Sequence, residues 1–221
     1  MSPEHLSALW LSVKVSVFAT ALNAVLGIPL AYLLARRRFW GKSALDVLVT
    51  LPLVLPPTVT GYYLILLLGR RGWLGAPLYQ ATGWSVAFTW YAAVITATVM
   101  ALPLLVRTAR AAIESVDRNL ERAAYTLGRP EWRTALEVTL PLARNGILAG
   151  LVLAFARALG EFGATLMLAG NIPGKTQTLP LSIYTAVQTG EAGQALALVG
   201  LLTLLSCAVV VASARLGARA L

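Results

Sequence analysis

The chain has 221 residues, of which 58% are hydrophobic and only 12% are charged, with a formal net charge of +9 at pH 7. Its mean hydropathy of +0.74 is far above that of a soluble domain of this length, so a soluble globular fold is excluded and a bilayer is expected around the chain. The single cysteine, Cys207, excludes a disulfide framework and a thiolate metal site.

Five stretches are long and apolar enough to cross a hydrocarbon core, which takes roughly 20 helical residues. These expected spans are 6–35, 45–69, 86–106, 147–169 and 195–214. The first has no basic n-region after Met1 and is too long for the apolar part of a signal peptide, so we expect it to persist as a helix. The sequence therefore predicts an all-α fold, a polytopic membrane helical bundle of about five transmembrane helices that forms one transmembrane domain over 1–221.

The region between the fourth and fifth spans leaves two interpretations open. Leu166 to Pro180 is interrupted by Gly170 and Gly174, whereas Leu181 to Val187 is apolar but too short to span a bilayer. Residues 170–193 therefore contain either a re-entrant or interfacial helix or an irregular connection.

Basic side chains gather on one side of the expected topology. Of the 18 lysines and arginines, 13 follow the first, third or fifth span, whereas Arg70, Arg71 and Lys175 lie on the opposite side. By the positive-inside rule, the N-terminus faces outward, and both the loop 107–141 and the C-terminus face the cytoplasm. Topology thus accounts for the positive charge, and no nucleic-acid partner is expected.

Within the loop 107–141, the sequence predicts a short helix with defined ends. Asp117 is suited to cap its start, Gly128 to end it in a left-handed conformation, and Pro130 to prevent its continuation. A helix of about 11 residues is roughly 16 Å long, which is too short to span a bilayer. The spacing of its residues is that of an amphipathic surface helix. One face carries Leu120, Ala124 and Leu127, and the other carries Arg118, Arg122 and Arg129.

Periodicity alone favours a solvated or lipid-surface helix between two spans, whereas the wider spacing favours a docking site. The spacing resembles the coupling signature of the membrane subunits of ABC importers, in which the Val position is usually Ile. It consists of Ala123-Ala124, three residues, Gly128, nine residues, Val138, one residue and Leu140-Pro141. When the signature is aligned on Gly128, the position of the family's glutamate is occupied by Arg122, and the acidic Glu121 lies one position earlier. Which residue makes the acidic contact with the ATPase subunits therefore stays open. The resemblance implies that separate ABC ATPase subunits dock on Leu120, Glu121, Arg122, Ala123, Ala124, Gly128, Arg129, Pro130, Glu131, Leu140 and Pro141.

Four further segments narrow the resemblance. They resemble segments of molybdate-type permeases, which are close kin of sulfate and tungstate permeases. The four segments are Leu51–Thr58, Gly69–Trp73, Leu159–Ala164 and Asn171–Thr178. The resemblance covers nearly the whole chain and implies a type I importer in a bacterial plasma (inner) membrane, working as a homodimer with a second copy of itself. It also implies an external, periplasmic oxyanion-binding protein, and ATPase subunits that hold ATP and Mg, so no cofactor is expected in this chain.

Two groups of residues are candidates for the translocation path or its gate. Arg157 and Glu161 lie one helical turn apart in the fourth span, where a charge costs about 2.5–3.5 kcal/mol on insertion scales, so both must face protein or water. Three roles are open for these two residues: they form a neutralised pair that fixes helix packing, they act in a gate, or they contact the substrate. The prolines of the second span produce either a static kink or a constriction. The candidate residues are Pro56, Pro57, Thr58, Arg157, Glu161 and Phe162.

Motifs for an enzyme or a metal site are missing from the sequence. Gly174-Lys175-Thr176 lacks the glycine five residues earlier that a phosphate-binding loop needs, and His5 is the only histidine. No catalytic residue and no metal ligand set is therefore expected. The sequence predicts a non-enzymatic permease for a tetrahedral oxyanion, with molybdate as the first candidate. Sulfate, thiosulfate and tungstate are alternatives within this class, and an uncoupled channel or structural membrane subunit is the alternative outside it.

Overall fold

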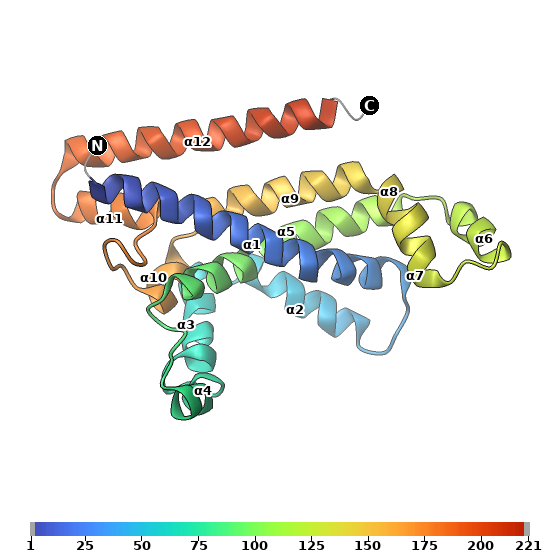
Figure 1. The fold of residues 1–221 in the computed structure, drawn as a ribbon, viewed down its shortest axis with the longest axis horizontal. Helices are drawn as coiled ribbons and strands as arrows, with labels where there is room; N and C mark the ends of the chain where they lie inside the picture. Colours follow the sequence, from blue (N-terminus) through green and yellow to red (C-terminus); the bar gives the residue numbers. More distant parts are fainter. Residues whose placement is uncertain (1–2, 219–221) are drawn as a thin grey trace.

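The protein's structure, a computed structural model, describes residues 3–218, and every regular element there is a helix (Figure 1). In chain order the elements are α1 (Pro3–Arg36), α2 (Lys42–Val54), α3 (Pro57–Leu68), α4 (Gly75–Thr82), α5 (Trp90–Glu114), α6 (Arg118–Thr126), α7 (Glu131–Thr134), the π-helix η1 (Ala135–Thr139), α8 (Leu140–Leu142), α9 (Arg144–Leu159), α10 (Gly163–Ala169), α11 (Leu179–Gln188) and α12 (Ala192–Ala218). The all-α expectation is confirmed over the described residues.

Within residues 3–218, three helices are long and apolar enough to cross a membrane. They are His5–Arg36 of α1, Trp90–Glu114 of α5 and Ala192–Val211 of α12. Two further candidate spans are bent: α2 and α3 meet at 119°, and Glu131–Leu142 meets α9 at 77°. The described chain thus has three such helices, or up to five if each bent pair forms one span.

The second expected span, 45–69, is divided between α2 and α3. Proline disfavours the helical conformation of the residue before it, and Leu55 and Pro56 are both extended, with ψ angles of 141° and 138°. Pro57 then begins α3, at a position where a helical residue needs no hydrogen-bond donor. The prolines therefore produce a complete break rather than a kink in one helix.

The fourth expected span, 147–169, is also two helices, because α9 ends at Leu159 and α10 begins at Gly163. Between them, Glu161 Oε1 accepts a hydrogen bond of 2.8 Å from the backbone N–H of Ala164, in the first turn of α10. A carboxylate at this place satisfies one of the N–H groups that have no partner within the helix. Hydropathy predicts one continuous helix here because the break contains a single charged residue.

Small side chains bring α1, α5 and α9 into close contact. Ala19 of α1 and Ala97 of α5 are fully buried in the core. A Cβ on Gly27 of α1 would lie 2.9 Å from Leu105 of α5, and a Cβ on Gly150 of α9 would lie 3.0 Å from the same side chain. Small residues permit such approach where van der Waals packing, rather than the hydrophobic effect, associates helices. These three helices form the densest part of the bundle.

The last two helices cover one flank of this core. A helix does form in the region that the sequence left open, since α11 runs from Leu179 to Gln188. The backbone N–H of Leu179 donates a hydrogen bond of 2.7 Å to Ser12 Oγ, which attaches α11 to α1. The long helix α12 lies beside α11 and along the bundle (Figure 1), yet only 11% of its apolar window is buried. Most of its apolar surface therefore has no partner in this chain.

The two breaks meet in space. The helix α3 projects from the bundle and packs against α10 (Figure 1). A Cβ on Gly61 would lie 2.8 Å from the Cα atom of Ala164, and a Cβ on Gly163 would lie 3.0 Å from the Cβ atom of Pro57. Glycine on each helix therefore permits the contact that holds the two broken spans together.

Replacement of Gly61 by alanine is expected to push α3 away from α10, because the atom that the new Cβ meets belongs to the backbone. Overpacking of this kind costs about 1–3 kcal/mol, so the thermal midpoint of the purified protein should fall. Gly200→Ala is the matched control, since nothing lies within 4 Å of the Cβ that it adds. Equal midpoints for the two variants would contradict the contact.

Candidate functional site

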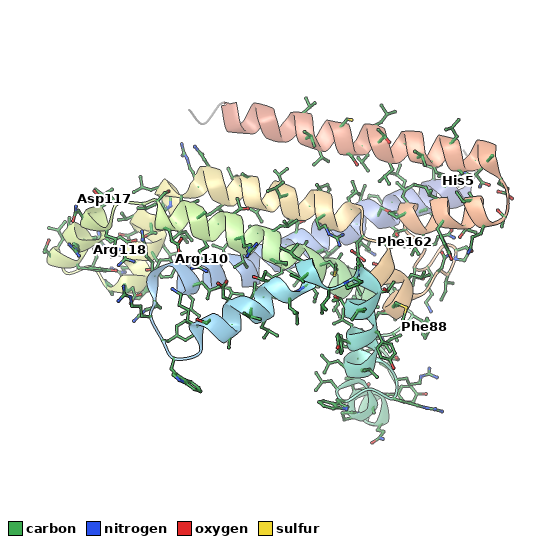
Figure 2. All side chains as sticks on the ribbon, turned by 180° about the vertical axis from the view of Figure 1, so that it is seen from behind. His5, Phe88, Arg110, Asp117, Arg118 and Phe162 are labelled. Atoms are coloured by element: carbon green, nitrogen blue, oxygen red, sulfur yellow. The ribbon has the colours of Figure 1, made fainter. Side chains whose placement is uncertain are left out.

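The polar segment, residues 115–142, lies at one end of the molecule and connects α5 to α9 (Figure 1). Figure 2 shows Asp117 and Arg118 at this end. The segment begins later than the expected loop 107–141, because α5 continues beyond its apolar stretch as far as Glu114. It contains the short helices α6 and α7, the π-helix η1 and the three-residue helix α8.

The helix α6 has the two ends that the sequence predicts. At its start, the side chain of Asp117 accepts a hydrogen bond of 2.9 Å from the backbone N–H of Asn119. At its end, Gly128 has a φ of +76°, and the backbone N–H groups of Gly128 and Arg129 both bond back onto the helix. Gly128 donates to the carbonyl of Tyr125 at 2.9 Å, and Arg129 donates to the carbonyl of Ala124 at 3.1 Å. This pair of bonds is the Schellman motif, which ends a helix sharply.

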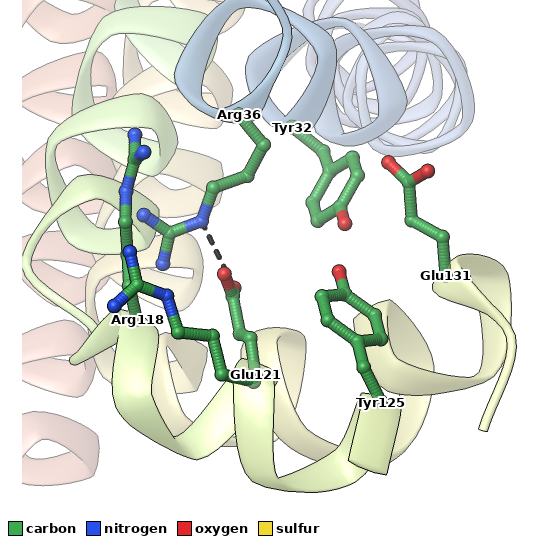
Figure 3. Close-up of a pocket in the computed structure, with 7 residues that line it drawn as sticks. Tyr32, Arg36, Arg118, Glu121, Tyr125 and Glu131 are labelled. Atoms are coloured by element: carbon green, nitrogen blue, oxygen red, sulfur yellow. Dashed lines mark hydrogen bonds and ion pairs between the residues drawn. The ribbon is translucent and has the colours of Figure 1, made fainter. Parts of the chain in front are cut away.

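Glu121 points back into the protein (Figure 3). Its oxygen Oε1 accepts hydrogen bonds of 2.9 Å from Arg36 Nε and 2.6 Å from Thr139 Oγ1. Arg36 also donates to the carbonyl of Val116 at 3.0 Å. The side chains of Arg36 and Glu121 are only 6% and 9% exposed, so the ion pair is buried. It joins α1, α6 and η1 at one point.

A second ion pair attaches the polar segment to the same end of α1. Arg37 pairs with Glu131 at the start of α7; the Arg37 side chain is exposed and that of Glu131 is half-buried. Lys42, at the start of α2, donates to the backbone carbonyl of Arg37 at 3.2 Å. Exposed pairs contribute little stability, so the buried pair of Glu121 is the stronger attachment.

A cavity of about 200 Å³ opens beside the buried ion pair. It is lined by Tyr32, Arg36, Arg118, Glu121, Arg122, Tyr125 and Glu131 (Figure 3). The hydroxyl groups of Tyr32 and Tyr125 point toward each other across it. Burial, together with the carboxylates of Glu121 and Glu131, raises the pKa of the Tyr125 phenol above its ordinary value.

The outward surface of the polar segment carries large apolar side chains. Leu127 is 82% exposed and Trp132 is 60% exposed, and Leu120 and Leu136 are exposed as well. Ala124, which the helical spacing places on the same face as Leu120 and Leu127, is buried instead. Of the other residues assigned to this surface from the sequence, Arg122, Ala123, Gly128, Arg129, Pro130 and Pro141 are exposed, whereas Glu131 and Leu140 are half-buried. Exposed apolar side chains of this size are typical of a protein interaction surface.

Arg157 and Glu161 form an ion pair with 2.7 Å between Nη1 and Oε2, although the two groups are not aligned as a hydrogen bond. The Glu161 side chain is 2% exposed and that of Arg157 is 27% exposed. Arg before Glu is the weaker order for pairing within a continuous helix, but α9 has already ended at Leu159. The two charges therefore neutralise each other within this chain, across the break between α9 and α10.

The other path candidates lie around the two breaks. Pro56, Pro57 and Thr58 are exposed where α3 begins. The Phe162 ring, half-buried in the second break, lies 5.1 Å from the Tyr184 ring of α11. The fold thus brings together candidates from spans that are about a hundred residues apart in the sequence.

The carboxylates of the described residues do not gather into a metal site. In the part of the chain that the structure describes, no group of three or more His, Cys, Asp or Glu side chains could hold a metal ion. Glu121, Glu131 and Glu161 are each paired with an arginine. The polar segment and the two breaks are therefore the features on which a function can be built.

Known proteins resemble this chain in both sequence and fold. Residues 27–221 match the family described as binding-protein-dependent transport system inner membrane component. One relative, the molybdenum transport system permease protein ModB of Escherichia coli (strain K12), is 52% identical over 190 residues, which cover 85% of this chain and 83% of the relative.

Two solved structures share the fold. A chain of a bacterial alginate ABC transporter in complex with a pentasaccharide-bound periplasmic protein matches with a TM-score of 0.79 at 17% identity, over 99% of this chain and 80% of that chain. A chain of the MetNI methionine ABC transporter in an inward-facing conformation matches with a TM-score of 0.71 at 18% identity, over 99% of both chains. At these identities the likeness shows the fold alone.

Gly128→Ala should loosen the end of α6 without a steric clash, because nothing lies within 4 Å of the added Cβ. The left-handed conformation costs a residue with a Cβ roughly 1–2 kcal/mol. Hydrogen exchange at the amides of residues 128 and 129 should therefore become about tenfold faster. Gly128→Asn is the milder control, since asparagine tolerates this conformation better. Equal exchange in Gly128→Ala and the unchanged chain would show that the motif does not hold the helix end.

Proposed function

Since the chain belongs to the family of binding-protein-dependent transport system inner membrane components, we propose that it is the membrane permease subunit of an ATP-driven ABC importer of molybdate. The observation that carries this proposal is the polar segment, which is fixed to α1 on its inner side and exposes Leu127 and Trp132 on its outer side. The 52% identity to a molybdenum permease supports the choice of cargo.

The chain is a transport subunit and not an enzyme. In the proposed complex, ATP and its Mg²⁺ are bound and hydrolysed by separate ATPase subunits, which dock on the polar segment from the cytoplasm. The basic residues on this side support the orientation by the positive-inside rule. Because α1 runs from the polar segment to the opposite end of the bundle, the N-terminus then faces outward (Figure 1).

A second copy of the chain completes the translocation path in this proposal. Each chain has one polar segment, whereas the ATPase subunits form a pair of sites. The complex therefore needs two permease copies, related by a two-fold axis. Each copy offers α3, which leaves the bundle with Tyr62, Tyr63 and Leu66 exposed. The substrate passes between the subunits, near the breaks at Pro56 and Glu161.

Selection of the anion takes place mostly outside this chain. Arg157, the cation nearest the breaks in sequence, is already paired with Glu161, so it offers little uncompensated charge to a dianion. Contacts along the path are therefore weak and transient, and a periplasmic oxyanion-binding protein supplies the specificity. High-affinity binding of molybdate to the isolated permease would contradict this division of roles.

Trp132→Ala tests the docking surface. Removal of an exposed aromatic anchor from an interface commonly costs about 2 kcal/mol, so the permease should bind its ATPase subunits roughly thirtyfold more weakly in a titration. Trp40→Ala is the matched control, because Trp40 is 100% exposed but lies in the turn after α1. Both variants should insert into membranes normally. Unchanged ATPase affinity in Trp132→Ala would remove this residue from the docking surface.

The cargo is tested with the complete complex reconstituted in vesicles. ATP hydrolysis should be stimulated most by the cognate binding protein loaded with molybdate, compared with the same protein loaded with tungstate, sulfate or thiosulfate. Stronger stimulation by sulfate or thiosulfate would reassign the cargo within the class. If no ATPase subunit binds and anions cross without ATP, the chain is an uncoupled channel instead.

A further inference from the structure

The buried ion pair of Arg36 and Glu121 connects the polar segment to the longest helix of the described chain. The helix α1 has 34 residues, which correspond to roughly 50 Å. Near its other end, Ser12 Oγ accepts the hydrogen bond from Leu179 with which α11 begins. The helix α1 is therefore attached to the polar segment at one end and to α11 at the other.

Glu121 lies beneath the outward surface of α6. The residue is 7% exposed, whereas its neighbours Leu120 and Arg122 are exposed. Its Oε1 atom is occupied from within the chain by Arg36 and Thr139. A protein that reaches the outward surface of α6 would thus meet Leu120 and Arg122, while the Glu121 carboxylate stays covered.

A buried pair transmits displacement better than an exposed one. Separation of its charges would leave an uncompensated charge inside the protein, whereas an exposed pair can exchange each partner for water. The Arg36 guanidinium also holds the carbonyl of Val116, just before α6. A shift of α6 that left the end of α1 in place would therefore break these contacts.

We propose that Glu121 is a positioning residue, which passes the displacement of α6 to α1 through Arg36 and does not itself contact the ATPase subunits. This inference rests on the proposed function, in which closure of the ATPase subunits displaces α6. It also bears on a question that the sequence left open, namely whether Glu121 makes the acidic contact with the ATPase subunits. Glu121 is buried, whereas Arg122, which stands at the family's glutamate position, is exposed. Thr139 ends the π-helix η1, so the same carboxylate is also attached to the residue that directly precedes α8.

The test is Glu121→Gln in the complete complex of permease, ATPase subunits and binding protein in vesicles, with anion uptake and ATP hydrolysis measured together. Glutamine keeps the size of the side chain and its hydrogen bond to Thr139, but it loses the charge that holds Arg36. We expect the ATPase subunits to stay bound and hydrolysis to continue, while anion uptake per ATP falls at least about fivefold. Arg36→Gln should have the same effect, and the exchanged pair of Arg36→Glu with Glu121→Arg should recover part of the uptake.

Asp46→Asn is the matched control, since it removes an ion pair of 3.1 Å between Asp46 of α2 and Arg110 of α5 that does not involve the polar segment. Its uptake per ATP should be unchanged. If Glu121→Gln releases the ATPase subunits while Asp46→Asn retains them, Glu121 is a contact residue and the inference is wrong. Normal uptake per ATP in Glu121→Gln would overturn it as well.

A second variant covers the case in which Glu121→Gln does not assemble. Thr139→Val keeps both charges and removes one hydrogen bond from the carboxylate, so it should assemble and show a smaller loss of uptake per ATP. No loss in that variant would overturn the inference. Absence of ATP-driven uptake in the unchanged complex would instead disprove the proposed function, which keeps the two failures distinct.

Discussion

Charged side chains enclosed by an apolar bundle need partners within the protein, and this requirement shapes both functional regions. Glu161 is shared between the N–H group of Ala164 and the guanidinium of Arg157, and so fixes where α10 begins. Glu121 is held by Arg36, and so fixes where α6 lies against α1. Loss of one partner from such a buried pair commonly costs about 3–5 kcal/mol, which makes each arrangement hard to change locally.

The rest of the bundle divides into a dense part and a looser part. Alanine and glycine let α1, α5 and α9 approach closely, so these helices are suited to move as one unit. The broken spans meet where glycine on each helix lets α3 approach α10, and α12 is mostly uncovered. In the proposed mechanism, a displacement that enters at the polar segment passes along the dense part and reaches the breaks from there.

The fold and the cargo rest on different kinds of support. Transporters of alginate and of methionine share the fold at 17% and 18% identity, so the fold itself does not specify what is carried. The case for molybdate comes from 52% identity to a molybdenum permease and from segments around the breaks. Because the arginine at the breaks is already neutralised, we propose that anion selection depends mostly on a partner outside the membrane.

The sequence by itself determined the membrane class, the apolar character of the long helices and both ends of α6, because hydropathy, capping and left-handed glycine are local properties of the chain. It also identified the candidates at the breaks. Only the tertiary structure decided that span 147–169 is two helices and that Glu121 faces Arg36, 85 residues away along the chain. Arg36 stands in a run of three arginines that topology already explains, so no local pattern marks its partner. Contacts between distant segments depend on how helices pack, and packing is not a property of any one segment.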